Sequence, residues 1–331
     1  MKPPYKITPL ILAKIASISE KIGEVKTAYL FHPPAELRRS NRIKIIQSSL
    51  EIEGNSMTEE QITALINNKR VLAPEKDILE VMNAISTYEK IDSFKPYSLK
   101  SLLEAHKLLM NGLVNRAGNL RTKSVGIVKG SQTIHVAPPA DRVKFLIEDL
   151  LEYTEKDGDL LLIKSCVFHY EFEFIHPFMD GNGRMGRLWQ TVLLRQQYPV
   201  FEYLPIEFLI KEQQKEYYSA LEKSDKLGES TPFLEFMLTI IERALEDLLS
   251  SQPVTLKGVD RIQLFRNIIG ENTFSRKEYM RHFKDISSAT ASRDLREATD
   301  NQILERIGEG RTTVYKYYNF QPSTQKALSF N

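Results

Sequence analysis

The residues with the clearest chemical potential lie together between His176 and Arg187, in the run HPFMDGNGRMGR. The segment 180–183, DGNG, is a turn sequence. Its two glycines permit positive φ angles and a close approach of the backbone to a ligand. The amides that open the following helix would then form an anion site. Arg184 and Arg187 are three residues apart and share roughly one face of that helix. Backbone amides together with two guanidinium groups suit a polyphosphate.

Two more side chains of this run could serve phosphate chemistry. Asp180 supplies a hard oxygen ligand, and one carboxylate with phosphate oxygens and water is a common way to hold Mg²⁺ in proteins. His176 directly precedes the turn. With an ordinary pKa of about 6.5, an imidazole can accept a proton from an attacking hydroxyl. Each feature alone also has a structural explanation, such as a packed histidine or a plain turn. Their combination within one short run favours a reactive site.

Composition and charge place this run in a folded globular protein. The chain has 331 residues, of which 42% are hydrophobic and 27% charged, and a formal net charge of +2. That apolar content is enough to offset the entropy cost of ordering the chain. No apolar run approaches the roughly 20 residues of a membrane-spanning helix, so we expect no membrane partner. Residues 1–4 lack the pattern of a signal peptide.

Cysteine usage indicates the redox compartment. Cys166 is the single cysteine of the sequence. One cysteine excludes an internal disulfide framework and any metal site built from several cysteines. We therefore expect a reducing, cytoplasmic location.

Most of the elements that must position the run read as helices, because apolar residues recur at helical spacing. The exception is the segment 118–136, which is rich in Val, Ile and Thr and predicts two short strands joined at Lys129-Gly130. The run 176–187 begins in a turn between two of the predicted apolar helices, 159–174 and 183–197. The predicted helices cover residues 7–30, 35–50, 74–91, 98–111, 138–154, 159–174, 183–197, 205–226 and 232–249, and a further helix begins at Thr58.

A second unit is predicted after the linker candidate at residues 250–253, SSQP. Ser275 and Glu278 form a capping-box pattern, a second helix begins near Ser287, and residues 303–318 read as strand, turn and strand. Helix, turn, helix and hairpin together suggest a winged helix. From residue 251 onward there are 13 Lys and Arg and 9 Asp and Glu, a net charge of +4.

The run 176–187 matches the signature HxFx(D/E)GNGRxxR at every defined position, so the chain resembles the Fic family. The resemblance implies a mainly α fold: a Fic-type helical core with a β-hairpin flap, followed by a C-terminal winged-helix domain. Residues 1–35 would form a helical extension. Residues 36–250 would form the core, with an inhibitory helix at about 36–55 and the flap at about 118–136. Residues 251–331 would form the winged helix.

The resemblance also implies an activity. Fic enzymes transfer AMP from ATP to a Ser, Thr or Tyr hydroxyl of a target protein and release pyrophosphate. By this resemblance His176 is the general base, and Asp180 binds a Mg²⁺ ion that bridges the α- and β-phosphates. Arg184 lies on the β-phosphate side and Arg187 on the γ-phosphate side. The remaining phosphate contacts would come from Gly181, Asn182 and Gly183.

A second match lies upstream, where residues 49–54, SLEIEG, fit the Fic inhibitory pattern (S/T)xxxE(G/N). In the family, this glutamate reaches the second arginine of the signature and blocks the place of the γ-phosphate. Here these residues would be Glu53 and Arg187, with Ser49 opening the pattern. The resemblance thus implies autoinhibition from within the chain. Glu53 could otherwise be an ordinary charge near a helix end, and Glu51 does not occupy the pattern position.

The other histidines and the aromatic residues near the run read as structural. We expect Phe178 and Trp189 in the core. His106 and His169 are expected to be structural, and His135 to be a strand or pocket residue of the hairpin. The resemblance implies that the flap holds a target segment by strand addition, which the unpaired amides of a sheet edge permit. Self-modification and homodimer formation are further expectations from the family.

Three alternative functions stay open. The enzyme could remove AMP, with Glu53 positioning the hydrolytic water, or it could transfer another nucleotide or phosphate group. A different class is a nucleotide-sensing regulator that binds DNA through its winged helix. DNA binding is not favoured, because Asp294, Glu297 and Asp300 dilute the charge of Arg293 and Arg296.

Overall fold

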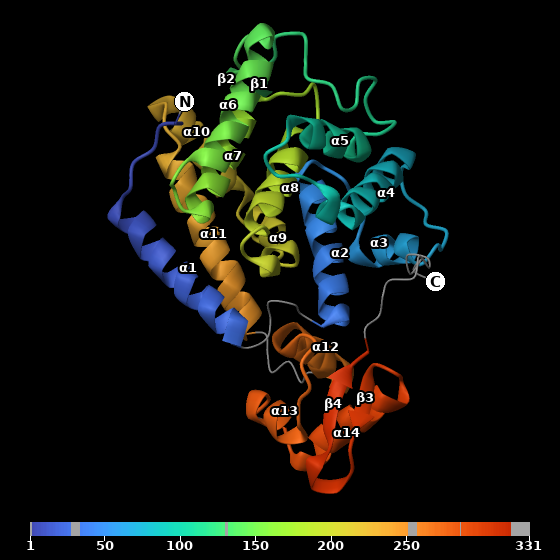
Figure 1. Cartoon of the computed structure of the whole chain (residues 1–331). Coiled ribbons are helices and arrows are strands. Elements are labelled where there is room, and N and C mark those ends of the chain that lie inside the picture. Colours follow the sequence, from blue (N-terminus) through green and yellow to red (C-terminus); the bar gives the residue numbers. More distant parts are fainter. Residues whose placement is uncertain (1, 28–33, 130–131, 251–256, 285, 319–331) are drawn as a thin grey trace. The chain divides into compact units, whose positions relative to one another are not determined.

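The computed structural model describes residues 2–27, 34–129, 132–250, 257–284 and 286–318 (Figure 1). The chain divides into two compact units, Met1–Ser251 and Gln252–Asn331. The first unit carries the whole run 176–187. Its helices and strands are α1 (Pro9–Thr27), α2 (Ala35–Ile52), α3 (Glu59–Ile66), α4 (Glu75–Glu89), α5 (Leu99–Leu109), β1 (Gly126–Lys129), β2 (Gln132–Val136), α6 (Val143–Lys156), α7 (Leu161–Ile175), α8 (Asn182–Leu194), α9 (Ile206–Glu212), α10 (Gln214–Leu227) and α11 (Thr231–Ser250). Short 3₁₀ turns lie at Ile91–Ser93, Ala140–Arg142 and Pro199–Glu202.

The centre of this unit is the pair of helices α7 and α8, which pack against each other (Figure 1). Both are buried around most of their circumference, as expected for helices without a continuous polar face. Phe178 lies in the turn between them and Trp189 lies on α8, and both are fully buried, which confirms their prediction as core residues. The mainly α fold expected from the sequence is confirmed.

Helix starts follow the capping signals of the sequence. Thr58 and Gln61 form a complete capping box at α3, and the Ser98 hydroxyl accepts a hydrogen bond from the Ser101 amide at the start of α5. The first helix begins at Pro9, two residues later than predicted, and is described to Thr27; residues 28–30 of the predicted range lie outside the described residues.

The prediction of one helix over residues 205–226 is wrong. The chain departs from helical geometry at Gln213 (φ −115°, ψ 38°), and α9 and α10 are separate helices. Neither glycine nor proline marks the break in the sequence. The break has a tertiary role: α9 packs on α2, α10 packs on α11, and the Gln214 side chain donates a hydrogen bond to the Ile52 carbonyl at the end of α2.

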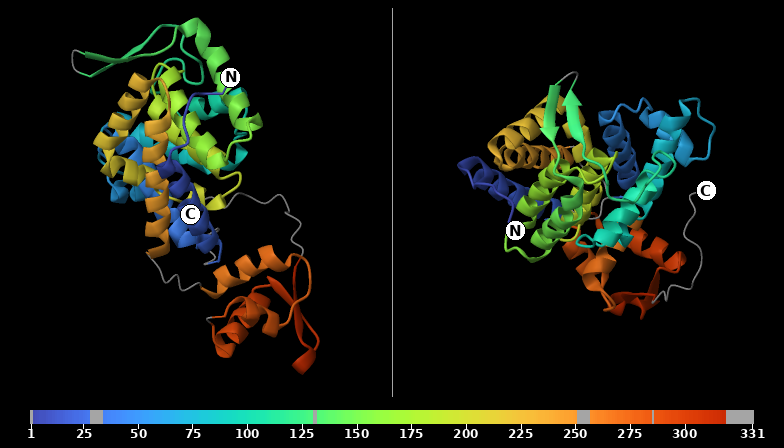
Figure 2. Two further views of the ribbon diagram at one scale, coloured as in Figure 1. Left: turned by 90° about the vertical axis from the view of Figure 1, so that its left-hand side faces the viewer. Right: turned by 90° about the horizontal axis from the view of Figure 1, so that it is seen from above.

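The predicted hairpin is present. β1 and β2 pair antiparallel from Gly126 opposite Val136 to Lys129 opposite Gln132, with a register irregularity after Ile127. Figure 2 shows this hairpin projecting from the helical body. The strands occupy only the last part of the expected flap segment, because residues 118–125 form turns and irregular structure.

The second unit contains α12 (Gly258–Ile269), α13 (Arg276–His282), α14 (Ser288–Asp300) and the antiparallel strands β3 (Leu304–Ile307) and β4 (Val314–Tyr317), with a 3₁₀ turn at Gly310–Thr312. Its core includes Phe265 and Phe274. A buried ion pair joins Arg261 to Asp294, which also accepts a hydrogen bond from the Tyr279 hydroxyl. The element order agrees with the winged-helix pattern, and the assignment of this unit as a winged helix stays a prediction. Among the described residues, no helix has both the length and the apolar character needed to cross a membrane.

Candidate functional site

Two residues in left-handed conformation shape the turn between α7 and α8. His176 ends α7 with φ 50° and ψ 61°, and Gly181 precedes α8 with φ 84°. A non-glycine residue rarely adopts this conformation, so its occurrence at His176 draws attention to the turn. Gly181 is required for a second reason, since a Cβ atom there would lie 2.7 Å from the sulfur of Met110. The turn leaves the first amides of α8 without partners inside their own helix, which suits an anion.

Asn182 closes this turn with its side chain. Its Oδ1 accepts from the Phe178 amide at 2.9 Å, and its Nδ2 donates to the Phe178 carbonyl at 3.0 Å. Both polar ends of the side chain are therefore engaged within the loop. The group of Asn182 that we expect to face a phosphate is the backbone amide.

Arg187 lies on the second turn of α8 and is only 3% exposed. Its Nη2 donates to Oε1 of Glu53 at 2.7 Å and to the Ser49 carbonyl at 2.9 Å, and its Nε donates to the Ser49 hydroxyl at 3.1 Å. The structure thus brings together all three residues of the pattern match. Burial by itself lowers the pKa of Arg187, but the charge and hydrogen bond of Glu53 outweigh burial and raise the pKa. Gly183 makes room for the pair, since a Cβ atom there would lie 2.6 Å from Oε1 of Glu53.

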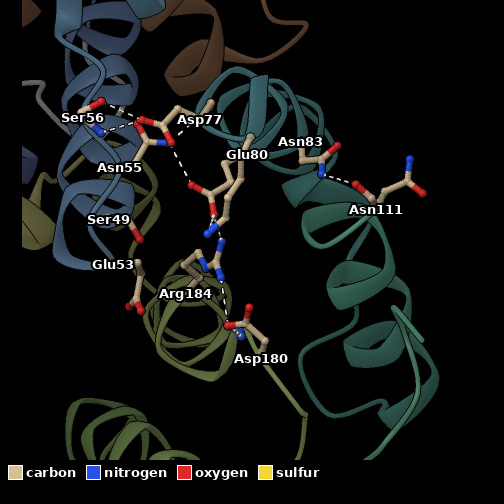
Figure 3. A network of polar contacts seen from close by, with 12 residues as sticks. Ser49, Glu53, Asn55, Ser56, Asp77, Glu80, Asn83, Asn111, Asp180 and Arg184 are labelled. Atoms are coloured by element: carbon tan, nitrogen blue, oxygen red, sulfur yellow. Dashed lines mark hydrogen bonds and ion pairs between the residues drawn. The ribbon is translucent and has the colours of Figure 1, made fainter. Parts of the chain in front are cut away.

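Arg184 points to a different pair of carboxylates and is 5% exposed. Its Nη1 donates to Oε1 of Glu80 on α4 at 3.1 Å, and its Nη2 donates to Oδ1 of Asp180 at 3.2 Å (Figure 3). Oδ1 of Asp180 also accepts from the Gly181 amide at 2.6 Å. Glu80 was not foreseen from the sequence. A single glutamate inside an amphipathic helix gives no signal of its partner.

The carboxylate of Asp180 fits a magnesium ion held mainly by phosphate oxygens. Its side chain is 57% exposed and stands beside the start of α8. The described residues contain no group of three or more His, Cys, Asp or Glu arranged to hold a metal. A Mg²⁺ ion needs no such cage, because one carboxylate, phosphates and water complete its coordination.

Arg121 is a second residue that the sequence did not reveal. It is buried, and its guanidinium donates to the carbonyls of Ile175 and His176 at the end of α7 and of Lys123 and Pro138 beside the two strands. A cation at the C-terminus of a helix is favourable because it complements the helix dipole. Arg121 thus holds the backbone of His176 and the base of the hairpin together.

His106 and His169 have structural contacts. The Nδ1 atom of His106 accepts from the Gly118 amide at 2.8 Å, which leaves Nε2–H to donate to the Asp180 carbonyl at 3.0 Å. Its ring stacks on Phe178 with a centroid distance of 3.6 Å. Burial lowers the pKa of His106 to about 4 and that of His169 to about 3, so both are neutral near pH 7. The side chain of His135 lies outside the described residues.

Sequence analysis did not single out two further residues near Arg187, Glu173 and Tyr218. Burial raises the pKa of Glu173 to about 7, and its Oε1 atom has no hydrogen-bond partner among the described residues. Tyr218 on α10 is exposed and lies within the fields of Glu53 and Arg187. Both residues sit in otherwise apolar or mixed helices, where periodicity alone does not distinguish a site residue from a packing residue.

Comparisons with known proteins agree on one family. The Fic/DOC family profile matches residues 96–194, which include α5 to α8 and the run 176–187. The chain is 41% identical to a Fic family protein from Desulfovibrio desulfuricans G20, whose crystal structure matches with a TM-score of 0.73 and covers 98% of this chain and 100% of that one. A Fic domain containing signaling protein from Bacteroides thetaiotaomicron VPI-5482, at 19% identity and a TM-score of 0.59, shares the fold over 72% of this chain and 99% of its own.

Curated relatives are more distant. The protein named Protein adenylyltransferase Fic from Nematostella vectensis is 27% identical over 267 residues, which cover 73% of this chain and 58% of that protein. The protein of the same name from Drosophila grimshawi is 26% identical over 251 residues, covering 70% and 48%. The chain spans about half the length of the curated relatives it matches. The full-length match at 41% identity, together with the intact signature at the α7–α8 turn, shows that this chain belongs to the Fic family.

Proposed function

We propose that the protein is an autoinhibited protein adenylyltransferase that moves AMP from ATP to a Ser, Thr or Tyr hydroxyl. The observation that carries the proposal is the arrangement at the start of α8. There, the opening amides of α8 and the two arginines of its first turns follow His176 in the chain, and the Glu53 carboxylate pairs with Arg187. The names of the curated relatives support the same reaction class.

In the proposed reaction, the hydroxyl oxygen of the target attacks the α-phosphorus of ATP. The bond from that phosphorus to the bridging oxygen breaks, pyrophosphate leaves, and the hydroxyl proton passes to the imidazole of His176. The amides of α8 and the two arginines hold and neutralise the phosphate oxygens, so the chain contributes positioning and charge stabilisation. Mg²⁺, which Asp180 would hold, supplies further neutralisation of phosphate charge when bound.

Inhibition follows from competition for one guanidinium. Glu53 places a carboxylate on the arginine that a γ-phosphate needs, and Ser49 takes two further hydrogen bonds of that arginine. The Arg187 side chain is 2% exposed and that of Glu53 is 30% exposed, so solvent screening acts on the pair mainly from the Glu53 side. ATP can bind productively only when Glu53 leaves Arg187.

The proposed partner is a target protein that presents its hydroxyl next to the β1–β2 hairpin. The two strands form a two-stranded sheet, whose outer edges can accept an added strand. Arg121 bonds the carbonyl of Pro138, which follows the hairpin, and the carbonyl of His176. A strand bound to the hairpin would therefore be held close to His176, the proposed general base. Self-modification and homodimer formation remain parts of the proposal.

The test uses Mg²⁺ and α-labelled ATP, with the protein itself and a cell lysate as acceptors. Wild type should incorporate little label, Glu53→Gly should incorporate much more, and Glu53→Gly combined with His176→Ala should incorporate none. Glu51→Gly is the matched control. The substitution is the same and lies on the same helix, but Glu51 contacts Gln47 and Lys211 and not Arg187.

The possible results separate the proposed role of each residue. Full hydroxyl modification by a variant lacking His176 would overturn the general-base assignment. Equal activation by the two glycine variants would overturn the inhibitory role of Glu53. Absence of label on every variant, while ATP still binds, would favour AMP removal or another nucleotide donor.

A further inference from the structure

We propose that Glu80 is a positioning residue that orients Arg184 toward the phosphates and couples that orientation to the segment following Glu53. The proposal rests on the proposed function and deepens it. Glu80 lies on α4, outside the run 176–187 and outside the inhibitory pattern.

The two oxygens of Glu80 serve two different parts of the site. The residue is 6% exposed. Oε1 accepts from Nη1 of Arg184 at 3.1 Å, and Oε2 accepts from Nδ2 of Asn55 at 2.9 Å. Figure 3 shows Glu80 between these two residues. The exposed ammonium of Lys76 also lies near the carboxylate, 3.9 Å from Oε1.

The Asn55 side of this contact is fixed. Asn55 follows Glu53 by two residues and is buried. Its Nδ2 also donates to the Asp77 carbonyl at 3.2 Å, and its Oδ1 accepts from the Met57 amide at 3.0 Å. The Asp77 carboxylate accepts from the amide and the hydroxyl of Ser56. The segment that leaves α2 is therefore fastened to α4 directly beyond the inhibitory glutamate.

The Arg184 side explains why a carboxylate is needed at Glu80. Arg184 is buried, and the two carboxylates that it contacts are those of Glu80 and Asp180. Without the charge of Glu80, the guanidinium would keep Asp180 as its charged partner. Asp180 is the carboxylate that the proposed function assigns to Mg²⁺. Glu80 therefore shares the guanidinium with Asp180 and weakens the competition of Arg184 with the metal ion for that carboxylate.

The carboxylate of Glu80 couples the position of Arg184 to the position of the segment that follows Glu53. The hydrogen bond from Asn55 stabilises the position of the segment in which Glu53 reaches Arg187. Loss of that hydrogen bond should shift the population toward the state in which Glu53 has left. Such coupling is reciprocal, so ATP bound at Arg184 and Arg187 should loosen the segment in turn.

The first arm of the experiment measures ATP kinetics in the Glu53→Gly protein, where inhibition is absent. Adding Glu80→Gln should raise the KM for ATP about tenfold and leave kcat within about threefold, as expected for loss of one charge-assisted contact. The Mg²⁺ concentration at half-maximal rate should also rise, because Arg184 then competes for Asp180. A merely structural role would not move the Mg²⁺ requirement. Glu75→Gln, the same change at an exposed residue of α4, is the control and should alter neither value.

The second arm tests the coupling. Asn55→Ala should raise AMP transfer of the otherwise wild-type protein about fivefold, and it should add less than about twofold in the Glu53→Gly background. Asn83→Ala is the control, since Asn83 is a buried asparagine of α4 that bonds the Asn111 carbonyl and not the site (Figure 3).

Unchanged KM and Mg²⁺ dependence in the first arm would overturn the positioning role. Equal activation by Asn55→Ala and Asn83→Ala would overturn the coupling.

If Glu53→Gly transfers no AMP, the proposed function fails. Calorimetry with a non-hydrolysable ATP analogue still tests the role of Glu80 in that case. Weaker Mg²⁺-dependent binding in Glu80→Gln then supports the positioning role, and unchanged binding overturns it. The unfolding midpoint of each variant confirms that it is folded, and the Asn55 arm stands independently if Glu80→Gln does not fold.

Discussion

Several interactions of the site converge on Arg187. Glu53 pairs with it directly. The charge of Arg187 also acts on Glu173 of α7 and Glu207 of α9, where it opposes the rise in pKa that burial causes. Among the described residues, Glu53 is the one carboxylate that bonds the guanidinium directly, so its removal leaves Arg187 near Glu173 and Glu207 without a direct carboxylate partner. That arrangement keeps the arginine charged and ready for an anion.

The space for the Glu53–Arg187 pair depends on Gly183. A Cβ atom at this position would lie 2.6 Å from Oε1 of Glu53 and 3.1 Å from Nη1 of Arg187. Gly183→Ala should therefore displace the Glu53 carboxylate and raise AMP transfer by about three- to tenfold, a shift of about 1 kcal/mol in the inhibited equilibrium. Labelled-ATP assays check this, and the same substitution in Glu53→Gly should give no rise. A loss of activity in both backgrounds would instead show that phosphate binding itself needs the glycine.

Glu207 gives a pH dependence of stability. It is 2% exposed, and burial raises its pKa to about 7 from an ordinary value of 4.5. Between these values the folded state holds a proton that the unfolded state has lost, so the free energy of unfolding falls as pH rises from about 4.5 to 7. From pH 8 to pH 6 this residue should add about 1 kcal/mol of stability.

Urea denaturation at pH 6 and pH 8 measures that difference. Glu207→Gln should reduce it, and Glu212→Gln, at an exposed glutamate of the same helix, should leave it unchanged. The pKa of Glu171 and of Glu173 is also raised to about 7 by burial, so part of the slope should persist. A full wild-type slope in Glu207→Gln would show that this carboxyl is not the titrating group.

At the scale of elements, the site is assembled where three helix ends meet. The end of α2 delivers Glu53, the end of α7 delivers His176, and the start of α8 delivers the amides and both arginines. Arg121 joins one of these ends to the hairpin by donating to four backbone carbonyls. The orientation of the proposed base and the position of a bound target strand therefore depend on one side chain.

Replacing Arg121 by glutamine should lower kcat for AMP transfer about tenfold or more, since the carbonyls lose a charged donor and the turn relaxes. ATP affinity should change less, because the proposed phosphate contacts come from α8. Arg121→Lys should not restore the rate, since an ammonium cannot reproduce the planar fork. Arg116→Gln, at an exposed arginine of the same loop, is the control. Equal losses of ATP affinity and kcat would indicate general damage to the fold.

At the scale of the whole molecule, every residue assigned to the site lies in the unit Met1–Ser251. Residues before α1 are integral to this unit: Lys2 and Tyr5 bond Asp159, and the Pro4 carbonyl accepts from Ser230. α1 itself packs along α11. The segment expected as an extension thus belongs to the body that carries the site.

A chain of residues 1–251 should therefore fold and bind ATP by itself. With Glu53→Gly it should transfer AMP to itself within about threefold of the full-length Glu53→Gly rate, because all groups of the site are retained. Circular dichroism and labelled-ATP assays of the two chains side by side check this. A folded short chain without transfer would show that the second unit contributes to the reaction.

The sequence by itself determined the turn between α7 and α8 and most of the helices. Glycine spacing, capping residues and apolar periodicity act over a few residues, so DGNG, Thr58 with Gln61, and the hairpin strands are readable locally. The approach of Glu53 to Arg187, across 134 positions, was expected only through the family resemblance.

Only the tertiary structure decided which carboxylate meets Arg184, which carbonyls surround Arg121, and where the helix breaks at Gln213. Glu80 and Arg184 are 104 positions apart, and no local pattern links them. Their contact exists because α4 and α8 are brought close in the fold, where burial makes an unpaired charge costly and selects a partner of opposite sign. Long-range pairing of this kind is a property of packing, which a local sequence pattern does not contain.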